Sequence, residues 1–403
     1  MKKYILALTS AATLLCACGV DDKYYGEQVV DPAEQIKPAY DIDWTAAADQ
    51  VDEKLIEHFM DTNRGTFWYT DQDRTGESTY CYWPQAHAMD VLVDAYLRLP
   101  EGDARRTTYA DYMSKWYDNK GNNYSNPYMG SYGFGNAYTD DSEWIILTLI
   151  RMYEATGVQK YLDAAAATYA ETVITRWTDD ENGGGIRWSL DASNSKNACS
   201  NGPAILCAMR LWANTTDETA KEGYLADAKK IYNWLSSTLY NPLTGAVADN
   251  MSNGTINGGA LTYNQGTFMG GAHELFKATG DTMYLTAAAR AARYTMNSLV
   301  TDGVLNNEGS GDNALFKGIF VRYAMNLWKD ASVDAADATL RQEIEQFLIY
   351  NGLVCWTEGV DKSEGSNWFF GAFWGEMGSS WDGRLNEQVS ASTMIEAMAL
   401  LID

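Results

Sequence analysis

The sequence predicts an all-α fold, an (α/α)6 barrel in which six helical hairpins form an inner and an outer ring. Helical periodicity runs through most of the chain, and almost no segment alternates as a strand does. The dipeptide Tyr-Leu begins at Tyr161, Tyr224 and Tyr284, a spacing of roughly 60 residues that indicates a repeated pair of helices. Some helices are apolar on all sides and others are amphipathic, as expected for one ring enclosed by another.

About twelve helices are expected from the pattern of apolar residues. In the second, Met89, Leu92, Val93 and Tyr96 share one face. In the fourth, the run 144–150 is apolar except for one threonine, which places this helix in the inner ring. The expected ranges are 44–62, 85–99, 104–118, 140 to the turn at 155–158, 161–177, 198–213, 224–240, 263–279, 282–299, 314–328, 335–350, and 391 to the end. A chain that stops near six hairpins favours closure over an open superhelix.

The connections between these helices differ at the two ends of the predicted barrel. Turns from inner to outer helices, such as 155–158 and 278–282, are short. Connections that lead into inner helices are long and rich in Gly, Asn, Trp and Tyr. Long loops on a rigid scaffold commonly carry function, so we expect the functional residues at one opening.

The N-terminus has the features of a bacterial lipoprotein signal. Two lysines precede the apolar stretch 4–15, and the following Leu-Cys-Ala-Cys resembles a lipobox, with Cys18 as the acylated residue. We therefore expect a signal peptide over 1–18, a flexible tether over 19–41 and a single folded domain over 42–403. This organisation predicts a cell-envelope lipoprotein at the outer membrane, facing the periplasm or the surface, with the lipid as its only membrane contact.

Composition restricts the class of partner. The formal net charge of -24 argues against nucleic acid and anionic membrane surfaces. Aromatic residues make up 13% of the chain, and those in the Gly/Asn-rich loops suit stacking on sugars. The charge favours a neutral or cationic partner. A polysaccharide or oligosaccharide as partner and a monomeric protein are the expectation.

The cysteines and histidines provide no metal motif. We expect Cys81, Cys199, Cys207 and Cys355 to be free buried thiols, with disulfide pairing as the alternative. The three histidines are far apart in sequence, and no HExxH, paired CxxC or GxSxG motif occurs. Residues 179–182 resemble part of a calcium loop but lack its ligand spacing. No metal and no cofactor are therefore expected.

Two adjacent carboxyl groups, Asp140 and Asp141, open the fourth helix. In one interpretation they are structural, with Thr139 or Asp140 as the N-cap and Glu143 completing a capping box. In the other, both face one cleft at the separation of roughly 5 Å that retaining glycoside hydrolysis requires. Coupling between neighbouring acids would let one stay protonated while the other is ionised.

Other residues in the long loops are candidates for substrate binding. The set comprises Trp83, Gln85, His87, Tyr138, Trp188, Asn197, Asn201, Tyr263, Asn264, Gln265 and Lys317. The amides would bind sugar hydroxyls and the tryptophans would stack on sugar faces. A structural role is the alternative for several of them: a satisfied buried histidine for His87, core packing for Trp83 and Trp188, and a buried ion pair for Lys317.

In this order the motifs DD-x-x-W, GGGI-x-W, KNA-x-SNG, TYNQG and FKG resemble those of glycoside hydrolase family 76, the endo-acting α-1,6-mannanases. The resemblance extends from Trp44 to the C-terminus. It implies an (α/α)6 barrel, cleavage of α-1,6-mannosidic bonds of mannan with retention of configuration, and no metal. It also implies that Asp140 is the nucleophile and Asp141 the acid/base.

Two other functions are compatible with the sequence. One is a lipid-anchored glycan-binding protein without turnover, although a binding module has no need for two adjacent acids at a helix start. The other is a hydrolase or lyase of the same fold that acts on another polysaccharide.

Overall fold

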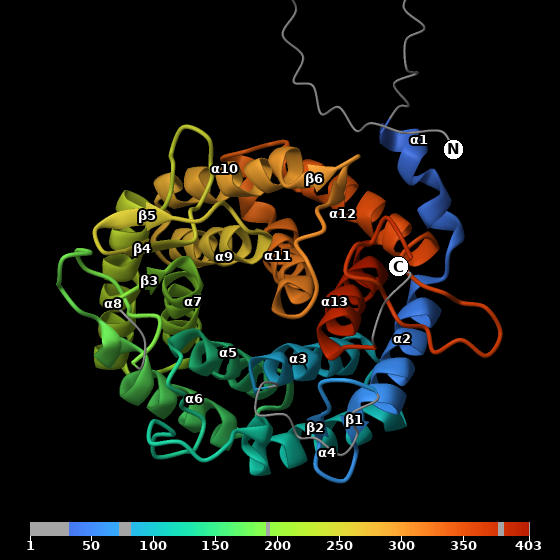
Figure 1. The fold of residues 1–403 in the computed structure, drawn as a ribbon, viewed down its shortest axis with the longest axis horizontal. Helices are drawn as coiled ribbons and strands as arrows, with labels where there is room; N and C mark the ends of the chain where they lie inside the picture. Colours follow the sequence, from blue (N-terminus) through green and yellow to red (C-terminus); the bar gives the residue numbers. More distant parts are fainter. Residues whose placement is uncertain (1–31, 72–81, 191–193, 378–382, 403) are drawn as a thin grey trace, which may run out of the picture.

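The computed structural model describes residues 32–71, 82–190, 194–377 and 383–402. In these residues twelve long helices form two concentric rings (Figure 1). The inner ring consists of α3 (Tyr82–Arg98), α5 (Thr139–Thr156), α7 (Ala198–Asn214), α9 (Thr262–Thr279), α11 (Asp312–Lys329) and α13 (Leu385–Leu401). The outer ring consists of α2 (Trp44–Phe59), α4 (Ala104–Asp118), α6 (Gln159–Thr172), α8 (Glu218–Thr238), α10 (Thr282–Ser298) and α12 (Leu340–Thr357). Each inner helix packs on the next and α13 packs on α3, which closes the ring and confirms the (α/α)6 barrel.

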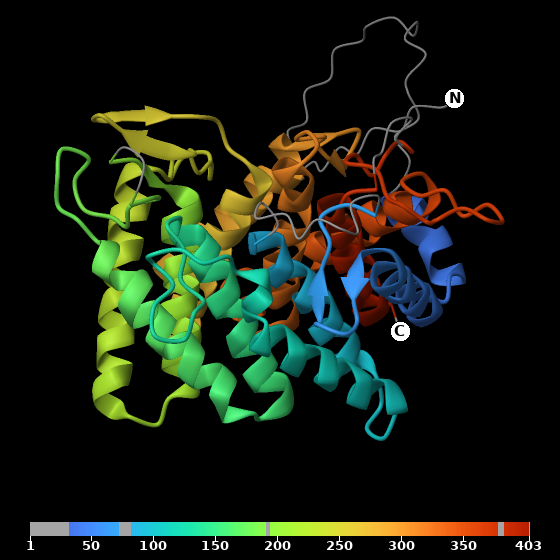
Figure 2. The same ribbon diagram turned by 60° about the horizontal axis from the view of Figure 1, so that its bottom comes forward.

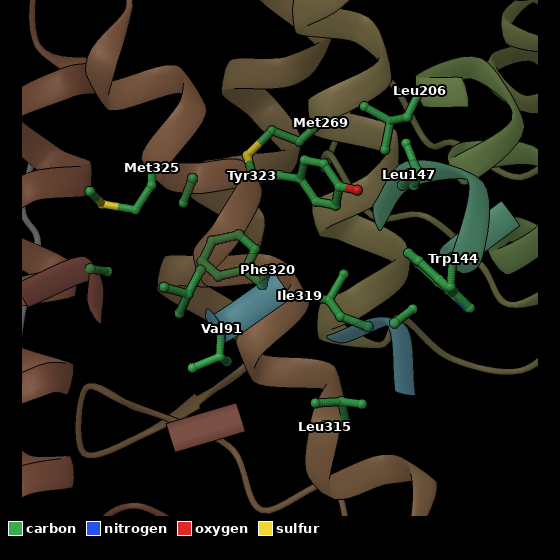
Figure 3. Close-up of a cluster of buried hydrophobic side chains, with 14 of the residues drawn as sticks. Val91, Trp144, Leu147, Leu206, Met269, Leu315, Ile319, Phe320, Tyr323 and Met325 are labelled. Carbon is green, nitrogen blue, oxygen red and sulfur yellow. The ribbon is translucent and has the colours of Figure 1, made fainter. Parts of the chain in front are cut away.

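Apolar side chains from the inner helices fill part of the barrel interior. Figure 3 shows one cluster of buried apolar side chains, which includes Val91 of α3, Leu147 of α5, Leu206 of α7 and Phe320 of α11. All four are buried. Burial on every side explains the apolar run 144–150 of α5, whereas other inner helices also bury polar side chains, such as Asp90 of α3 and Lys317 of α11.

The residues that cap the helices differ between the two ends of the barrel. The short turns end α5 and α9 with left-handed glycines, Gly157 (φ 71°) and Gly280 (φ 70°). Four outer helices, α2, α4, α8 and α10, begin with an aspartate whose carboxylate accepts from the first turn. The N-caps of the inner helices α5, α7, α9, α11 and α13 make no side-chain capping bond. These inner N-termini stand where the long loops enter.

Short strands connect some of the long loops to one another. The strands are β1 (Met60–Asp61), β2 (Thr66–Phe67), β3 (Lys196–Asn197), β4 (Asn250–Ser252), β5 (Thr255–Asn257), β6 (Val300–Thr301) and β7 (Val304–Leu305). Antiparallel pairing of Lys196 with Met251 joins the loop before α7 to the loop before α9. The β4–β5 hairpin stands above the helices at one end of the barrel (Figure 2).

Part of the predicted tether is folded. Residues 32–41 form α1 (Pro32–Ile36) and a 3-10 helix, η1 (Lys37–Asp41), both packed on α12. The Trp44 indole donates to the Ala39 carbonyl (2.7 Å), and burial of Ile36 and Ala39 explains why this segment does not remain extended. The predicted lipidation site, Cys18, lies outside the described residues.

Several helix boundaries differ from the prediction: α6 ends at Thr172, α8 begins at Glu218 and α12 ends at Thr357. For three further boundaries the structure gives a reason. α2 ends at Phe59 because Met60 turns into β1, and α12 begins at Leu340 because residues 331–335 form a 3-10 helix. α13 begins at Leu385, six residues earlier than its apolar pattern suggests, because its polar first turn is also buried. None of the described helices combines the length and apolar character that a membrane crossing requires.

Candidate active site

A cleft of about 1000 Å³ opens at the end of the barrel where the long loops enter the inner helices. Its walls come from the start of α3, α5, α7, α9 and α11 and from the loops before them. The lining residues are Tyr69, Tyr82, Trp83, Tyr124, Tyr138, Asp140, Asp141, Trp144, Trp188, Asn197, Cys199, Asp249, Leu261, Tyr263, Asp312, Asn313 and Phe316. Aromatic rings and carboxyl groups dominate this surface, so it suits a polar ligand with flat apolar faces.

Asp140 and Asp141 lie side by side in the first turn of α5, half-buried at the base of the cleft. Tyr138 occupies the N-cap position and its side chain makes no capping bond. Glu143, the expected partner in a capping box, is completely buried and neither of its carboxylate oxygens has a hydrogen-bond partner. The capping interpretation is therefore wrong, and both acids are available to a ligand.

The neighbouring loop fixes the turn that carries the acids. Thr139 donates through its N–H to the Trp188 carbonyl (2.8 Å) and through its hydroxyl to the Arg187 carbonyl (2.6 Å). The buried Arg176 guanidinium donates to the Thr139 hydroxyl (3.0 Å) and to the Asn136 carbonyl (2.6 Å). Hydrogen bonds on both sides hold the start of α5 in one position, as pre-organised catalysis requires.

The two acids differ in electrostatic environment. Burial raises the pKa of Asp140 to about 6, although hydrogen bonds from Cys199 and Trp188 favour its charged form. The pKa of Asp141 lies well above its usual range because of burial and, in addition, the negative charges of Asp140 and Asp312. The pair therefore keeps a proton more readily on Asp141 than on Asp140.

Aromatic rings flank the acids. Tyr138 and Trp188 pack with ring centroids 5.0 Å apart, and the Trp188 indole N–H donates to the Asp140 carboxylate (3.3 Å). Tyr263 stacks on Phe316 at 3.8 Å. Their exposed faces provide platforms on which a sugar ring can stack, in addition to hydrogen bonding at the acids.

The structure brings five of the predicted substrate-binding residues to the cleft and leaves six outside it. The five are Trp83, Tyr138, Trp188, Asn197 and Tyr263. The six are Gln85, His87, Asn201, Asn264, Gln265 and Lys317, and all of them are buried.

Three of these buried amides hold loops rather than face a ligand. Gln85 bonds both the N–H and the carbonyl of Phe67 (2.9 and 2.6 Å). Asn201 does the same with Ile186 (2.8 and 3.1 Å). Gln265 accepts from Val247 and donates to the Gly245 carbonyl (2.5 and 3.0 Å). Because each amide bonds the backbone of the preceding loop, their assignment to sugar binding is wrong.

The other three side chains, those of His87, Asn264 and Lys317, are buried and contact other side chains of the barrel. His87 packs against the rings of Trp83 and Trp144, and burial lowers its pKa well below the usual range. Asn264 donates to the Asp249 carboxylate (3.0 Å). The Lys317 ammonium is completely buried, has no hydrogen-bond partner and lies 5.7 Å from the Trp374 ring centroid. Burial lowers the pKa of Lys317 to about 8.

Sequence reasoning missed several residues of the cleft, above all two acids. Asp249 precedes β4, and Asp312 begins α11 and accepts from the Trp83 indole (3.2 Å). Asp312 lies at an inner-helix start, as Asp140 and Asp141 do. This position in the sequence could have identified it as a residue of the cleft. Cys199 also lines the cleft. Cys199, Cys207 and Cys355 are free and buried, as predicted, whereas Cys81 lies outside the described residues.

An (α/α)6 barrel with two adjacent carboxyl groups in an aromatic-walled cleft has the construction of a glycoside hydrolase. Residues 43–402 match glycosyl hydrolase family 76, and the chain belongs to that family. Among curated relatives, mannan endo-1,6-alpha-mannosidase DCW1 of Candida glabrata is 28% identical over 57% of this chain, which spans about half (52%) of that protein. The corresponding DFG5 enzyme of Candida albicans is 25% identical over 80% of this chain and 72% of its own length.

Solved structures include close relatives of this barrel. The GH76A alpha-1,6-mannanase from Salegentibacter sp. HEL1_6 is 36% identical with a TM-score of 0.76, covering 89% of this chain and 100% of that chain. An inactive variant of the same enzyme, in which two consecutive aspartates are replaced by alanine, was solved with an alpha-1,6-linked mannotetraose and matches with a TM-score of 0.76 at 34% identity.

Proposed function

We propose that this protein hydrolyses α-1,6-mannosidic bonds of mannan with retention of configuration. The observation that carries the proposal is the pair Asp140 and Asp141, adjacent in one helical turn, fixed by the neighbouring loop and exposed in an aromatic-walled cleft. Retaining glycosidases need one carboxylate as nucleophile and a second carboxyl group as acid and then base.

The environments of the two acids assign their roles. Asp140, whose charged form accepts hydrogen bonds from Trp188 and Cys199, attacks the anomeric carbon. Asp141, which holds its proton more tightly, donates it to the leaving oxygen. In the second step Asp141 takes a proton from water, and this water displaces Asp140 from the glycosyl intermediate.

The relatives support both the α-1,6 linkage of the proposed substrate and the roles proposed for Asp140 and Asp141. The Salegentibacter enzyme, described as an alpha-1,6-mannanase, is inactive when two consecutive aspartates are replaced, and in that form it carries an alpha-1,6-linked mannotetraose. Asp140 and Asp141 are consecutive aspartates in the cleft of this chain. A neutral mannan is also compatible with the protein's net charge of -24, because no charge repulsion opposes it.

The test is incubation of the protein with linear α-1,6-mannan and, separately, with α-glucans and other polysaccharides. Product lengths followed over time should show short α-1,6-manno-oligosaccharides from mannan alone. The anomer formed first, observed by proton NMR, should match the configuration of the bond cleaved. Binding of mannan without products would favour a glycan-binding protein, and cleavage of another polysaccharide instead would favour a different hydrolase or lyase.

We also propose that the protein is a cell-envelope lipoprotein, acylated at Cys18 after removal of the preceding signal peptide. The lipobox and the basic, apolar N-terminus support this localisation. Cys18→Ser should abolish incorporation of labelled palmitate and release the protein from the membrane fraction. Absence of label from the wild type would contradict the proposal.

A further inference from the structure

Lys196, in the loop before α7, has an unusual environment. Its side chain is 0% exposed, and its ammonium contacts four oxygen atoms. Three are backbone carbonyls, those of Thr178 (2.7 Å), Gly183 (2.5 Å) and Gly184 (2.9 Å). The fourth is a carboxylate oxygen of Asp180, at 3.0 Å. Backbone carbonyls and carboxylates are also the ligands that calcium takes in protein loops.

The triple glycine explains how the carbonyls come to face one point. Gly183 and Gly185 have left-handed backbone conformations, with φ of +73° and +107°. A Cβ on Gly184 would lie 2.4 Å from the Trp177 ring, so only glycine allows this approach. Residues 179–182 resemble a calcium loop in sequence, but the cation at its centre is supplied by the chain itself.

This cage connects directly to the candidate active site. Trp188 follows the glycines, and its N–H donates to the Ser195 carbonyl (2.9 Å), one residue before Lys196. The Trp188 carbonyl accepts from the Thr139 N–H, and its indole donates to Asp140. Asn197, next after Lys196, lines the cleft. Displacement of residues 178–188 and 195–197 would therefore move both Trp188 and Asn197.

We propose that Lys196 is a built-in cation that replaces a metal ion and acts as a positioning residue for Trp188 and Asn197. A buried charge is costly unless it is paired and hydrogen-bonded, and here the four oxygens provide those partners. Without the ammonium, Asp180 keeps the Asn182 N–H (2.9 Å) and the Gly183 carbonyl keeps the Asp180 N–H (3.2 Å), but all four oxygens lose the positive charge that they share, so the loop loosens. The catalytic consequence rests on the proposed function, whereas the structural consequence does not.

The test is chemical rescue of Lys196→Ala in the full-length protein. This variant lacks three methylenes and an ammonium, so propylammonium matches the missing group. Because loss of a buried cation leaves its partners uncompensated, Tm should fall by at least about 5 °C. Propylammonium should restore part of this loss and raise kcat/KM on mannan, whereas propan-1-ol, similar in shape but uncharged, should not. Lys221→Ala, at a half-exposed position of α8 where the lysine pairs with Glu218, is the matched control and should show neither effect.

Several results would overturn the inference. One is an unchanged Tm in Lys196→Ala, and another is equal rescue by propan-1-ol and propylammonium, which would indicate packing alone. If Lys196→Ala does not fold, Lys196→Met decides: it keeps the apolar stem without the charge, so a wild-type Tm would contradict the built-in cation and a lowered Tm would support it. Addition of calcium or of a chelator should leave the wild-type Tm unchanged. Failure of wild-type mannan cleavage would defeat the proposed function but leave the Tm result intact.

Discussion

The indole N–H of Trp188 donates a hydrogen bond to the carboxylate of Asp140, with 3.3 Å between nitrogen and oxygen. The two residues come from different connections: Trp188 lies in the loop before α7 and Asp140 in the first turn of α5. Trp188 also packs against Tyr138, so one side chain contributes both to the cleft wall and to the orientation of the candidate nucleophile.

Trp188→Phe should separate these two contributions. Phenylalanine keeps a ring for stacking but removes the N–H, and a hydrogen bond to a charged group is worth about 1.5–3 kcal/mol. We expect kcat on α-1,6-manno-oligosaccharides to fall about 10- to 100-fold with little change in KM. Trp188→Ala should raise KM as well. Equal kinetics for wild type and Trp188→Phe would show that the hydrogen bond has no role in turnover.

The fold could be predicted because its signals are local and repeated. The apolar run 144–150 indicates an inner helix, and Gly157 in the short turn after it indicates where that helix ends. Neither indication requires knowledge of distant contacts. The 3-10 segment 37–41 was not predictable in this way. It packs on α12, some 300 residues later in the chain, and buries Ala39, whereas its own composition is that of a linker.

The candidate site was predicted in part. The criterion of position at an inner-helix start correctly predicted that Asp140 and Trp83 line the cleft, because every such start faces the same opening. The same criterion failed for Gln85 and Gln265, because both occupy helix starts but face the preceding loop and bond its backbone. A side chain's direction about the helix axis depends on how the helix is rotated against its neighbours, which residue type alone does not reveal.

The glycines of the helices provide a matched pair for testing the packing of the two rings. A Cβ on Gly266 of α9 would lie 2.8 Å from the Phe320 Cα on α11, whereas a Cβ on the exposed Gly223 of α8 would meet nothing within 4 Å. Gly266→Ala should destabilise the protein by about 1–3 kcal/mol through overpacking. Gly223→Ala should stabilise it by about 0.5–1 kcal/mol. Urea denaturation of both variants measures this contrast, and similar effects in the two would contradict close inner-ring packing.

The pH dependence of turnover should reflect the unequal acids. The nucleophile must be ionised, so kcat/KM should rise as pH passes through about 6, the pKa of Asp140. The acid must be protonated, so kcat/KM should fall at higher pH, where Asp141 loses its proton.

Asp312→Asn tests the cause of the alkaline limb. Removal of this negative charge should lower the pKa of Asp141, because Asp312 disfavours its ionised form. The alkaline limb of the kcat/KM profile should therefore move to lower pH, while the acid limb changes less. Asp249→Asn, another acid of the cleft that is no part of this electrostatic contact, is the control. Identical alkaline limbs in wild type and Asp312→Asn would refute the role of Asp312.

Replacement of the two acids distinguishes their roles most directly. Asp140→Asn should abolish turnover of mannan, since no nucleophile remains. It should nevertheless stay folded. The folded-state pKa of Asp140 is raised above its unfolded value, so ionisation disfavours the folded state increasingly between about pH 4 and about pH 6 and fully above that range. The neutral amide should therefore leave Tm at pH 7 equal or higher. Tm measured at pH 5 and at pH 7 checks this sign: the gap between variant and wild type should widen at pH 7.

Asp141→Asn should lose activity on mannan but keep the first step on an aryl mannoside whose leaving group needs little protonation. In Asp141→Ala, azide should restore turnover of this aryl substrate, because azide attacks the glycosyl intermediate without the help of a general base. The product should then be a mannosyl azide that retains the substrate's configuration, detectable by NMR. A mannosyl azide of retained configuration from Asp140→Ala, and one of inverted configuration from Asp141→Ala, would exchange the two assignments. Wild-type activity on mannan in Asp140→Asn or in Asp141→Asn would remove the replaced residue from the mechanism.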